Sequence, residues 1–201
     1  MGTMTSLFTG LISLIFSFVV FGHADAGPFD SPGATKALVC SACHGFGGNS
    51  PGDTVPILAG MEPAYFKKAI KDYAEGRRPS PEMEPFAKMV LQSGLDEIAS
   101  YFAEQKRRST RIKLDPAAVS RGKTISLICA VCHGPQGKGD PEKLIPNLRG
   151  QPPGYLVNQM FLFKQDKRNP ADQTLIALKG LMKLIPEKRF ADLAAYYSSL
   201  K

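Results

Sequence analysis

The chain has 201 residues, which is room for one large domain or two small ones, and its 25 Lys and Arg against 18 Asp and Glu give a net charge of +7. The positive charges are scattered along the chain, so they do not favour nucleic acid as the partner. A basic protein of this kind instead favours partners with acidic surfaces, through long-range electrostatic steering.

The chain opens on an apolar segment. Residues 7–21 are almost wholly apolar, and the small residues Ala24-Asp25-Ala26 follow. This pattern is typical of a secretory signal peptide, whereas a membrane-spanning helix needs about 20 apolar residues. We therefore predict a signal peptide at 1–26, cleaved after Ala26, and a mature periplasmic protein rather than one held by an uncleaved anchor. The mature chain is one charge more positive, because the segment contains Asp25 but no Lys or Arg.

All four cysteines lie in two copies of one motif. Residues 40–45 read C-S-A-C-H-G, and residues 129–134 read C-A-V-C-H-G. Cys-x-x-Cys-His is the pattern of c-type haem attachment. Its thiols form thioethers with the two vinyl groups of one haem, and the histidine lies under the iron as the proximal ligand. The predicted set is Cys40, Cys43, Cys129 and Cys132 for attachment, with His44 and His133 as iron ligands.

Three other uses of paired cysteines explain the sequence less well. A disulfide framework suits an exported protein, but it gives no reason for a histidine after each pair. A structural zinc site can use such pairs, but these lie 89 residues apart and the histidines would again be unexplained. A redox-active dithiol would not need two copies. We therefore predict two covalently bound haem c groups, each with one iron.

The sequence outside the motifs repeats as well. A Pro-x-Leu-x-Gly stretch follows each motif, at 56–60 and 146–150, and a tyrosine, Tyr65 or Tyr155, lies five residues past each glycine. Each tyrosine begins a segment with helical apolar spacing, and each half closes with an apolar, aromatic helix. The repeat predicts one layout for both halves: a short helix into the motif, a loop, a middle helix, a second loop and a terminal helix.

Residues 106–114 are basic and lack this pattern, so we predict a linker there between domains at 27–105 and 115–201. Asp115 can cap the entry helix of the second domain, and Pro116 suits its first turn. A bound haem would add apolar surface to the small core of each domain, which has about 80 residues. The expected fold class is all-α, with two tandem domains.

These features resemble class I cytochromes c, and specifically the dihaem cytochrome c4 family, over nearly all of the mature chain. The cytochrome subunit of flavocytochrome c sulfide dehydrogenase is also similar, through residues 58–63 and the segment after them. The resemblance implies two class I cytochrome c domains, each wrapped around one haem. It implies a carrier of electrons between respiratory or dehydrogenase partners, not an enzyme. The alternative is a cytochrome subunit attached to a flavoprotein or a membrane complex.

The resemblance also implies a methionine as the second axial ligand, on the loop before the terminal helix. In the first half Met83, 18 residues before Tyr101, matches the family's ligand loop, and the prolines around it indicate a rigid loop. Met89 is the competing candidate, and Met61 is predicted to be a packing residue. Ligation by histidine and methionine raises the reduction potential, which suits electron transfer.

The second half departs from this pattern, because Leu178 stands 18 residues before Tyr196. Met182, four residues later, is the nearest candidate ligand; a lysine (Lys179 or Lys183) or an open position are the alternatives. Histidine and cysteine are excluded, because the mature chain has none outside the motifs. Another methionine, at position 160, is predicted to pack in the core. An open position under Leu178 would be apolar and poorly suited to polarising a bound peroxide.

Basic residues could also form a docking face for acidic redox partners, with an ordinary solvated surface as the alternative. The predicted face comprises the Lys and Arg residues at 106–113 together with Arg77, Arg78, Lys164, Lys167 and Arg168.

Overall fold

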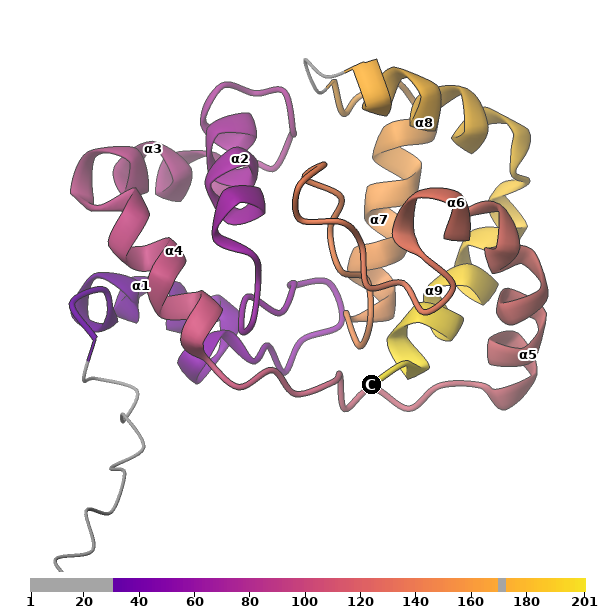
Figure 1. Ribbon diagram of the computed structural model, residues 1–201, viewed down its shortest axis with the longest axis horizontal. Helices are drawn as coiled ribbons and strands as arrows, with labels where there is room; N and C mark the ends of the chain where they lie inside the picture. The colour runs from indigo at the N-terminus through magenta and orange to yellow at the C-terminus, as the bar shows by residue number, and fades with distance from the viewer. Residues whose placement is uncertain (1–30, 170–172) are drawn as a thin grey trace, which may run out of the picture.

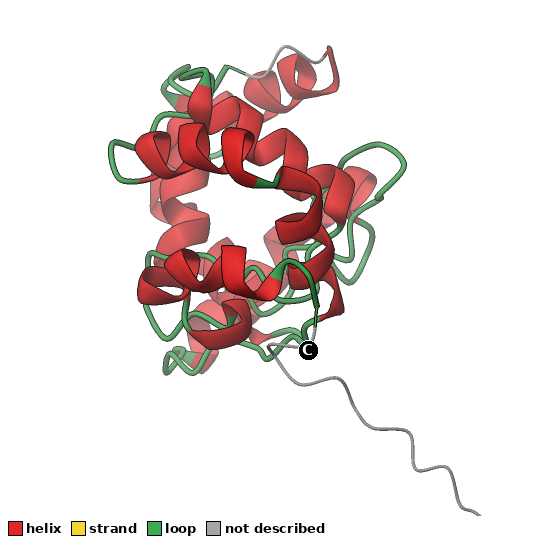
Figure 2. Cartoon of the chain, turned by 90° about the vertical axis from the view of Figure 1, so that its left-hand side faces the viewer, coloured by secondary structure: helices red, strands yellow, loops and turns green. Residues whose placement is uncertain are grey.

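The computed structural model describes residues 31–169 and 173–201, so the predicted signal peptide lies outside the described part of the chain. The described residues form helices and loops, with one isolated β-bridge between Asp140 and Ile145 (Figure 2). Within those ranges, no helix has the length and apolar character needed to cross a membrane. The helices form two groups that lie side by side, α1 to α4 and α5 to α9 (Figure 1).

The first group surrounds a core of aliphatic and aromatic side chains from all four of its helices, including Phe66, Val90 and Phe102. An edge contact between the rings of Tyr101 and Phe102, with centroids 5.1 Å apart, contributes to this core. The helices are α1 (Ala34–His44), α2 (Pro63–Ala74), α3 (Met83–Ser93) and α4 (Leu95–Glu104).

The second group has its own core, which includes Leu156, Phe190 and Leu193. The predicted start of its first helix is confirmed: the Asp115 carboxylate accepts hydrogen bonds from two backbone N–H groups of the first turn, at 2.9 and 3.2 Å. Pro116 is the first helical residue. The helices are α5 (Pro116–Ile125), α6 (Ala130–His133), α7 (Pro153–Lys164), α8 (Gln173–Leu184) and α9 (Phe190–Ser199).

The entry helix and the terminal helix of each group cross in direct contact, and a glycine makes this possible. A Cβ atom at Gly122 would lie 1.9 Å from the carbonyl oxygen of Asp192 on α9. A Cβ atom at Gly33, just before α1, would lie 2.0 Å from the carbonyl oxygen of Glu97 on α4. The same close crossing therefore occurs in both halves.

Two segments predicted to be loops are helical, which corrects the expected layout. Met83 is the first residue of α3, and Met182 lies in the last turn of α8. Pro85 does not break α3, because it stands in the first turn, where its missing N–H would have no intrahelical partner. Each predicted ligand loop therefore contains a helix between the middle and terminal helices.

The two groups are joined by a non-helical segment at 106–114, which runs along the lower edge of Figure 1 and contacts the second group. In this segment the Thr110 N–H donates to the Gly150 carbonyl at 2.8 Å. A buried amide makes a second connection: Gln151 accepts a hydrogen bond from the Ile57 N–H and donates one to the Ile57 carbonyl, both at 2.9 Å. Asp53 accepts a further bond, from the Gly154 N–H at 2.9 Å.

Candidate haem sites

Each Cys-x-x-Cys-His motif ends a helix at its histidine. α1 ends at His44 and α6 ends at His133. The following residues, Gly45 and Gly134, have φ angles of 73° and 72°, a conformation that favours glycine. The glycine that closes both motifs is therefore required by the turn that leads the chain away from the histidine.

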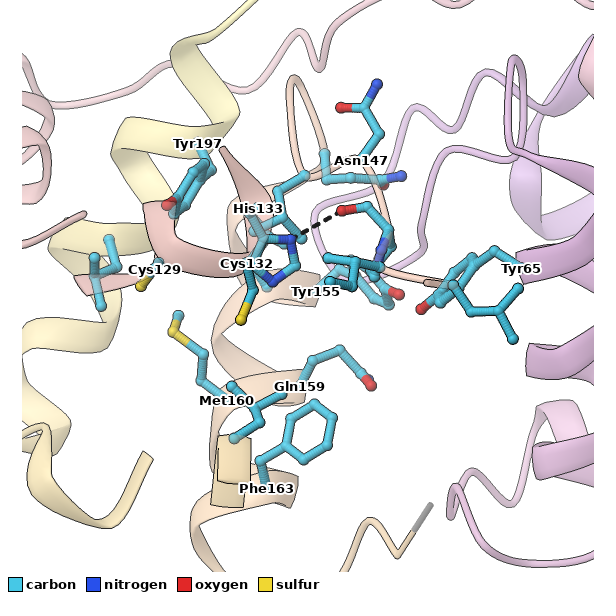
Figure 3. Close-up of a pocket in the computed structure, with 18 of the residues that line it drawn as sticks. Tyr65, Cys129, Cys132, His133, Asn147, Tyr155, Gln159, Met160, Phe163 and Tyr197 are labelled. Carbon is cyan, nitrogen blue, oxygen red and sulfur yellow. Dashed lines mark hydrogen bonds between the residues drawn. The ribbon is translucent and has the colours of Figure 1, made fainter. Parts of the chain in front are cut away.

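Both histidines are oriented by a backbone carbonyl. His44 Nδ1 lies 2.8 Å from the Pro56 carbonyl oxygen, and His133 Nδ1 lies 3.0 Å from that of Pro146 (Figure 3). Donation from Nδ1–H to the carbonyl leaves the Nε2 lone pair free for a metal. Burial lowers the pKa of both histidines, which favours the neutral form that binds iron. Sequence analysis identified the repeated prolines but not this role.

No disulfide joins the four cysteines. Cys40 and Cys129 are half-buried, and burial raises the pKa of both thiols. Cys43 and Cys132 are exposed. Among the described residues, no three His, Cys, Asp or Glu side chains gather in a group that could hold a metal ion.

The second motif opens onto a cavity with mainly apolar walls. Cys129, Cys132 and His133 line one side of it, and Met160 and Met182 also line it. Figure 3 shows the Met160 sulfur pointing towards the two cysteine sulfurs. The remaining apolar lining includes Leu156, Phe163, Leu178, Leu181, Leu193 and Tyr197.

The predicted axial methionines occupy different environments. Met83 is half-buried and packs against the first core, as do Cys40 and Met61. Met182 is 4% exposed and belongs to the second core. Met89, the competitor of Met83, is exposed.

The two lysines considered as ligands for the second haem are engaged elsewhere. Lys179 Nζ lies 3.2 Å from one carboxylate oxygen of Asp166 and donates to the Asn169 side chain at 2.9 Å. Lys183 Nζ lies 2.8 Å from the other Asp166 oxygen. Of the predicted ligands in this half, Met182 is therefore the one that is not held by a salt bridge.

The polar end of the cavity reaches the interface between the groups, where arginines from each half meet. Arg78 Nη2 donates to the Tyr155 hydroxyl at 2.5 Å, and its Nε donates to Gln159 Oε1 at 3.1 Å. Arg168 Nη1 donates to the same amide oxygen at 2.9 Å. Arg78 is 2% exposed and Arg168 7%. Their inclusion in the predicted docking face was wrong, because both side chains are buried between the two halves.

Tyr65 lies beside Tyr155 (Figure 3) and interacts with both arginines of this cluster. Burial alone would raise the pKa of this tyrosine, but the charges of Arg78 and Arg168 and their hydrogen bonds to it lower the pKa to about 8. Tyr65 and Arg78 are 13 residues apart, and so are Tyr155 and Arg168. This shared spacing was the one signal in the sequence that could have indicated the cluster.

The cavity and its surroundings fit a haem. The buried Nε atoms of Arg107 and Arg168 have no hydrogen-bond partner within the described chain, and both residues line the cavity. Unpaired buried donors of this kind are costly, and the carboxylates of a haem would satisfy them. The apolar walls suit the porphyrin ring, and the thiols of Cys129 and Cys132 with the His133 imidazole suit its attachment. A haem bound here would supply an iron that alternates between ferric and ferrous states.

Comparison with known proteins agrees with this geometry. The cytochrome c family model matches residues 119–201. The chain is 31% identical over 199 residues to cytochrome c4 of Pseudomonas aeruginosa, covering 94% of this chain and 98% of that relative. The crystal structure of reduced recombinant cytochrome c4 from Pseudomonas stutzeri superposes with a TM-score of 0.76 at 29% identity, covering 83% of this chain and 96% of that one.

A shorter match is to the cytochrome subunit of sulfide dehydrogenase from Chlorobaculum tepidum, 31% identical over 97 residues, covering 44% of this chain and 87% of that subunit. The predicted all-α class I cytochrome c fold is confirmed, as is covalently bound haem c as the cofactor. The chain therefore belongs to the cytochrome c4 family, and it is an electron-transfer cytochrome rather than an enzyme.

Proposed function

We propose that this chain is a periplasmic dihaem electron carrier, made after removal of residues 1–26 as a signal peptide. One haem c is attached in each of two domains, 27–105 and 115–201, on either side of the 106–114 linker. The observation that carries the proposal is the duplicated geometry at His44 and His133. Each histidine follows a pair of cysteines that no disulfide joins, ends a helix, and is oriented by a proline carbonyl at 2.8 or 3.0 Å.

The proposed attachment residues are Cys40 and Cys43 in the first domain and their counterparts in the second motif, with the two motif histidines as proximal ligands. Met83 and Met182 are the proposed distal ligands. Support for Met182 comes from its burial beside the second motif's cavity and from the salt bridges that hold Lys179 and Lys183. Two histidine–methionine sites would give both domains potentials suited to electron transfer.

The chain's own residues prepare the sites for rapid electron transfer. The proline carbonyls and the core packing fix the ligands, so little rearrangement accompanies a change of charge at the iron. The buried arginines and tyrosines at the interface provide polar groups where the second site meets the first domain. The second site therefore opens at the boundary with the first domain, which suits the passage of an electron within the molecule.

We propose that acidic redox partners dock on exposed basic residues of the linker. Lys106, Arg108, Arg111 and Lys113 are exposed, whereas Arg107 is turned inward and donates to the Arg149 carbonyl at 2.5 Å. The second candidate function, a cytochrome subunit of a flavoprotein complex, is favoured by the match to the sulfide dehydrogenase subunit. Size-exclusion chromatography of native extract separates the two, because a free carrier elutes at the size of a single chain.

A spectroelectrochemical titration of the holoprotein tests the carrier proposal. Two one-electron waves are expected, together with the weak long-wavelength charge-transfer band of methionine-ligated ferric haem. Met83→Leu should remove the contribution of the first haem to this band and lower the reduction potential of that haem. Met182→Leu should have the same two effects on the second haem. Met89→Leu, at an exposed residue of α3, is the matched control and should change neither. A single one-electron wave from the wild type would contradict the proposal.

A further inference from the structure

The helix that contains Met182 is held at its end by a lysine from a neighbouring helix. α3 is followed by Gly94, whose N–H donates to the Val90 carbonyl at 3.3 Å, but α8 ends at Leu184 with no glycine after it. The last carbonyls of a helix have no donor within the helix and need partners from elsewhere. At the end of α8 the Ile185 N–H donates to the Met182 carbonyl at 3.3 Å, and a side chain from α7, Lys164, supplies the further donor.

The Lys164 ammonium group reaches three backbone carbonyls around the end of α8. Its Nζ atom lies 2.7 Å from the Ile185 carbonyl oxygen, 3.2 Å from that of Lys183 and 3.5 Å from that of Met182. It also lies 5.9 Å from the centroid of the Phe190 ring, which begins α9. A positive charge at this point complements the negative end of the helix dipole. Lys164 therefore ties α7, the end of α8 and the start of α9 together.

The segment held in this way forms part of the wall of the second haem cavity. Leu178, Leu181 and Met182 all come from α8 and line the cavity. Helix ends are the places where helices fray, so an uncapped end would leave the Met182 backbone free to shift. A metal–ligand bond tolerates little displacement, so the position of this backbone decides whether the thioether reaches an iron.

The first half fixes its methionine by a different device. The Met83 N–H donates a hydrogen bond to the hydroxyl oxygen of Ser80 at 3.2 Å. In the register that aligns Tyr65 with Tyr155, the residue corresponding to Lys164 is Ala74, which has no ammonium group. The lysine cap is thus specific to the second half, where the methionine lies at the end of its helix rather than at the start.

We propose that Lys164 is a positioning residue for the axial methionine of the second haem and acts through the backbone of α8. This inference rests on the proposed function, in which Met182 ligates that haem. Lys164 holds the last turn of α8 in place through its hydrogen bonds to the carbonyls, and it thereby keeps the Met182 sulfur at the iron and keeps exogenous ligands out.

The test compares the holoprotein with Lys164→Met, which keeps an unbranched apolar side chain but deletes the ammonium group. Lys164→Arg is the conservative rescue, and Lys167→Met is the matched control at an exposed lysine. Two readouts are taken: the thermal loss of the methionine–iron charge-transfer band, and the affinity of the ferric protein for imidazole. In Lys164→Met the half of the charge-transfer band that comes from the second haem should disappear at a lower temperature than it does in the Lys167→Met control. It should also bind imidazole at one haem about tenfold more tightly. The charged hydrogen bonds of Lys164 are stronger than neutral ones, so their loss makes it easier for the methionine to leave the iron and for imidazole to replace it.

Each outcome separates the inference from the proposed function. An unchanged band and an unchanged imidazole affinity in Lys164→Met, with half of the band lost in Met182→Leu, would overturn the role of Lys164 alone. A full band in Met182→Leu would overturn both the ligand assignment and the role of Lys164, while the two one-electron waves would still support the carrier. Loss of both halves of the band in Lys164→Met would show general unfolding rather than positioning and would also overturn the inference.

Discussion

The paired hydrogen bonds of Gln151 allow a quantitative test of how the two domains are joined. The side chain is 3% exposed, and it satisfies both the N–H and the carbonyl of Ile57 at 2.9 Å. In Gln151→Leu the side chain keeps a similar volume, so the loss of packing is small. Two buried backbone groups are then left without partners, at about 1–3 kcal/mol each. The expected loss of stability is therefore about 2–6 kcal/mol.

Urea unfolding of the holoprotein, followed by far-UV circular dichroism, measures this loss from the shift of the midpoint at constant slope. Gln136→Leu, at an exposed loop position of the same domain, is the control and should change the free energy by less than about 0.5 kcal/mol. A loss of stability below about 1 kcal/mol in Gln151→Leu would contradict the expected cost of two unpaired backbone groups. It would show that water reaches the interface and takes over the hydrogen bonds to the Ile57 backbone.

Two further substitutions test the packing of the second domain. Gly122→Ala should destabilise it by more than about 3 kcal/mol in the same assay, because the new Cβ atom would lie 1.9 Å from the Asp192 carbonyl oxygen and α9 would have to move. Gly180→Ala on α8 meets open space and should be neutral or stabilising by up to about 1 kcal/mol. Asp192→Asn tests a charge: hydrogen bonds from Arg121, at 2.8 and 3.0 Å, lower the pKa of Asp192. The stabilisation by this carboxylate is present above its unfolded pKa and is lost as the pH falls through the lower folded pKa. The variant should therefore be less stable than the wild type at neutral pH, and the difference should shrink as the pH falls below the ordinary range of a carboxylic acid.

The proposed attachment residues can be identified from the sequence alone because covalent chemistry fixes their spacing. Two thiols must reach two vinyl groups of one haem, so the motif is local, and the structure places His133 and both of its cysteines around one cavity. The glycine after each histidine is local as well, since it depends on a positive φ angle. Signals of this kind need no knowledge of tertiary structure.

The interface could not be predicted, because its partners lie far apart in the chain. Arg78 contacts Tyr155, 77 residues away, and apart from its 13-residue spacing from Tyr65 nothing distinguishes it from the exposed basic residues of the linker. Arginine side chains are normally exposed, so a sequence alone does not indicate that this one is buried between two domains. The helical character of α3 was missed for a local reason: the prolines around Met83 suggested a loop, although Pro85 is tolerated in a first turn.

The intact mass of the purified mature protein, compared with the mass of its sequence, shows how many haem groups the chain carries. We expect a mass increase equal to two haem groups, because thioether bonds survive denaturation. A protein in which Cys40 and Cys43 are both changed to Ala should carry one haem, and so should the equivalent double variant of Cys129 and Cys132. One haem or none on the wild-type chain would rule out a dihaem carrier.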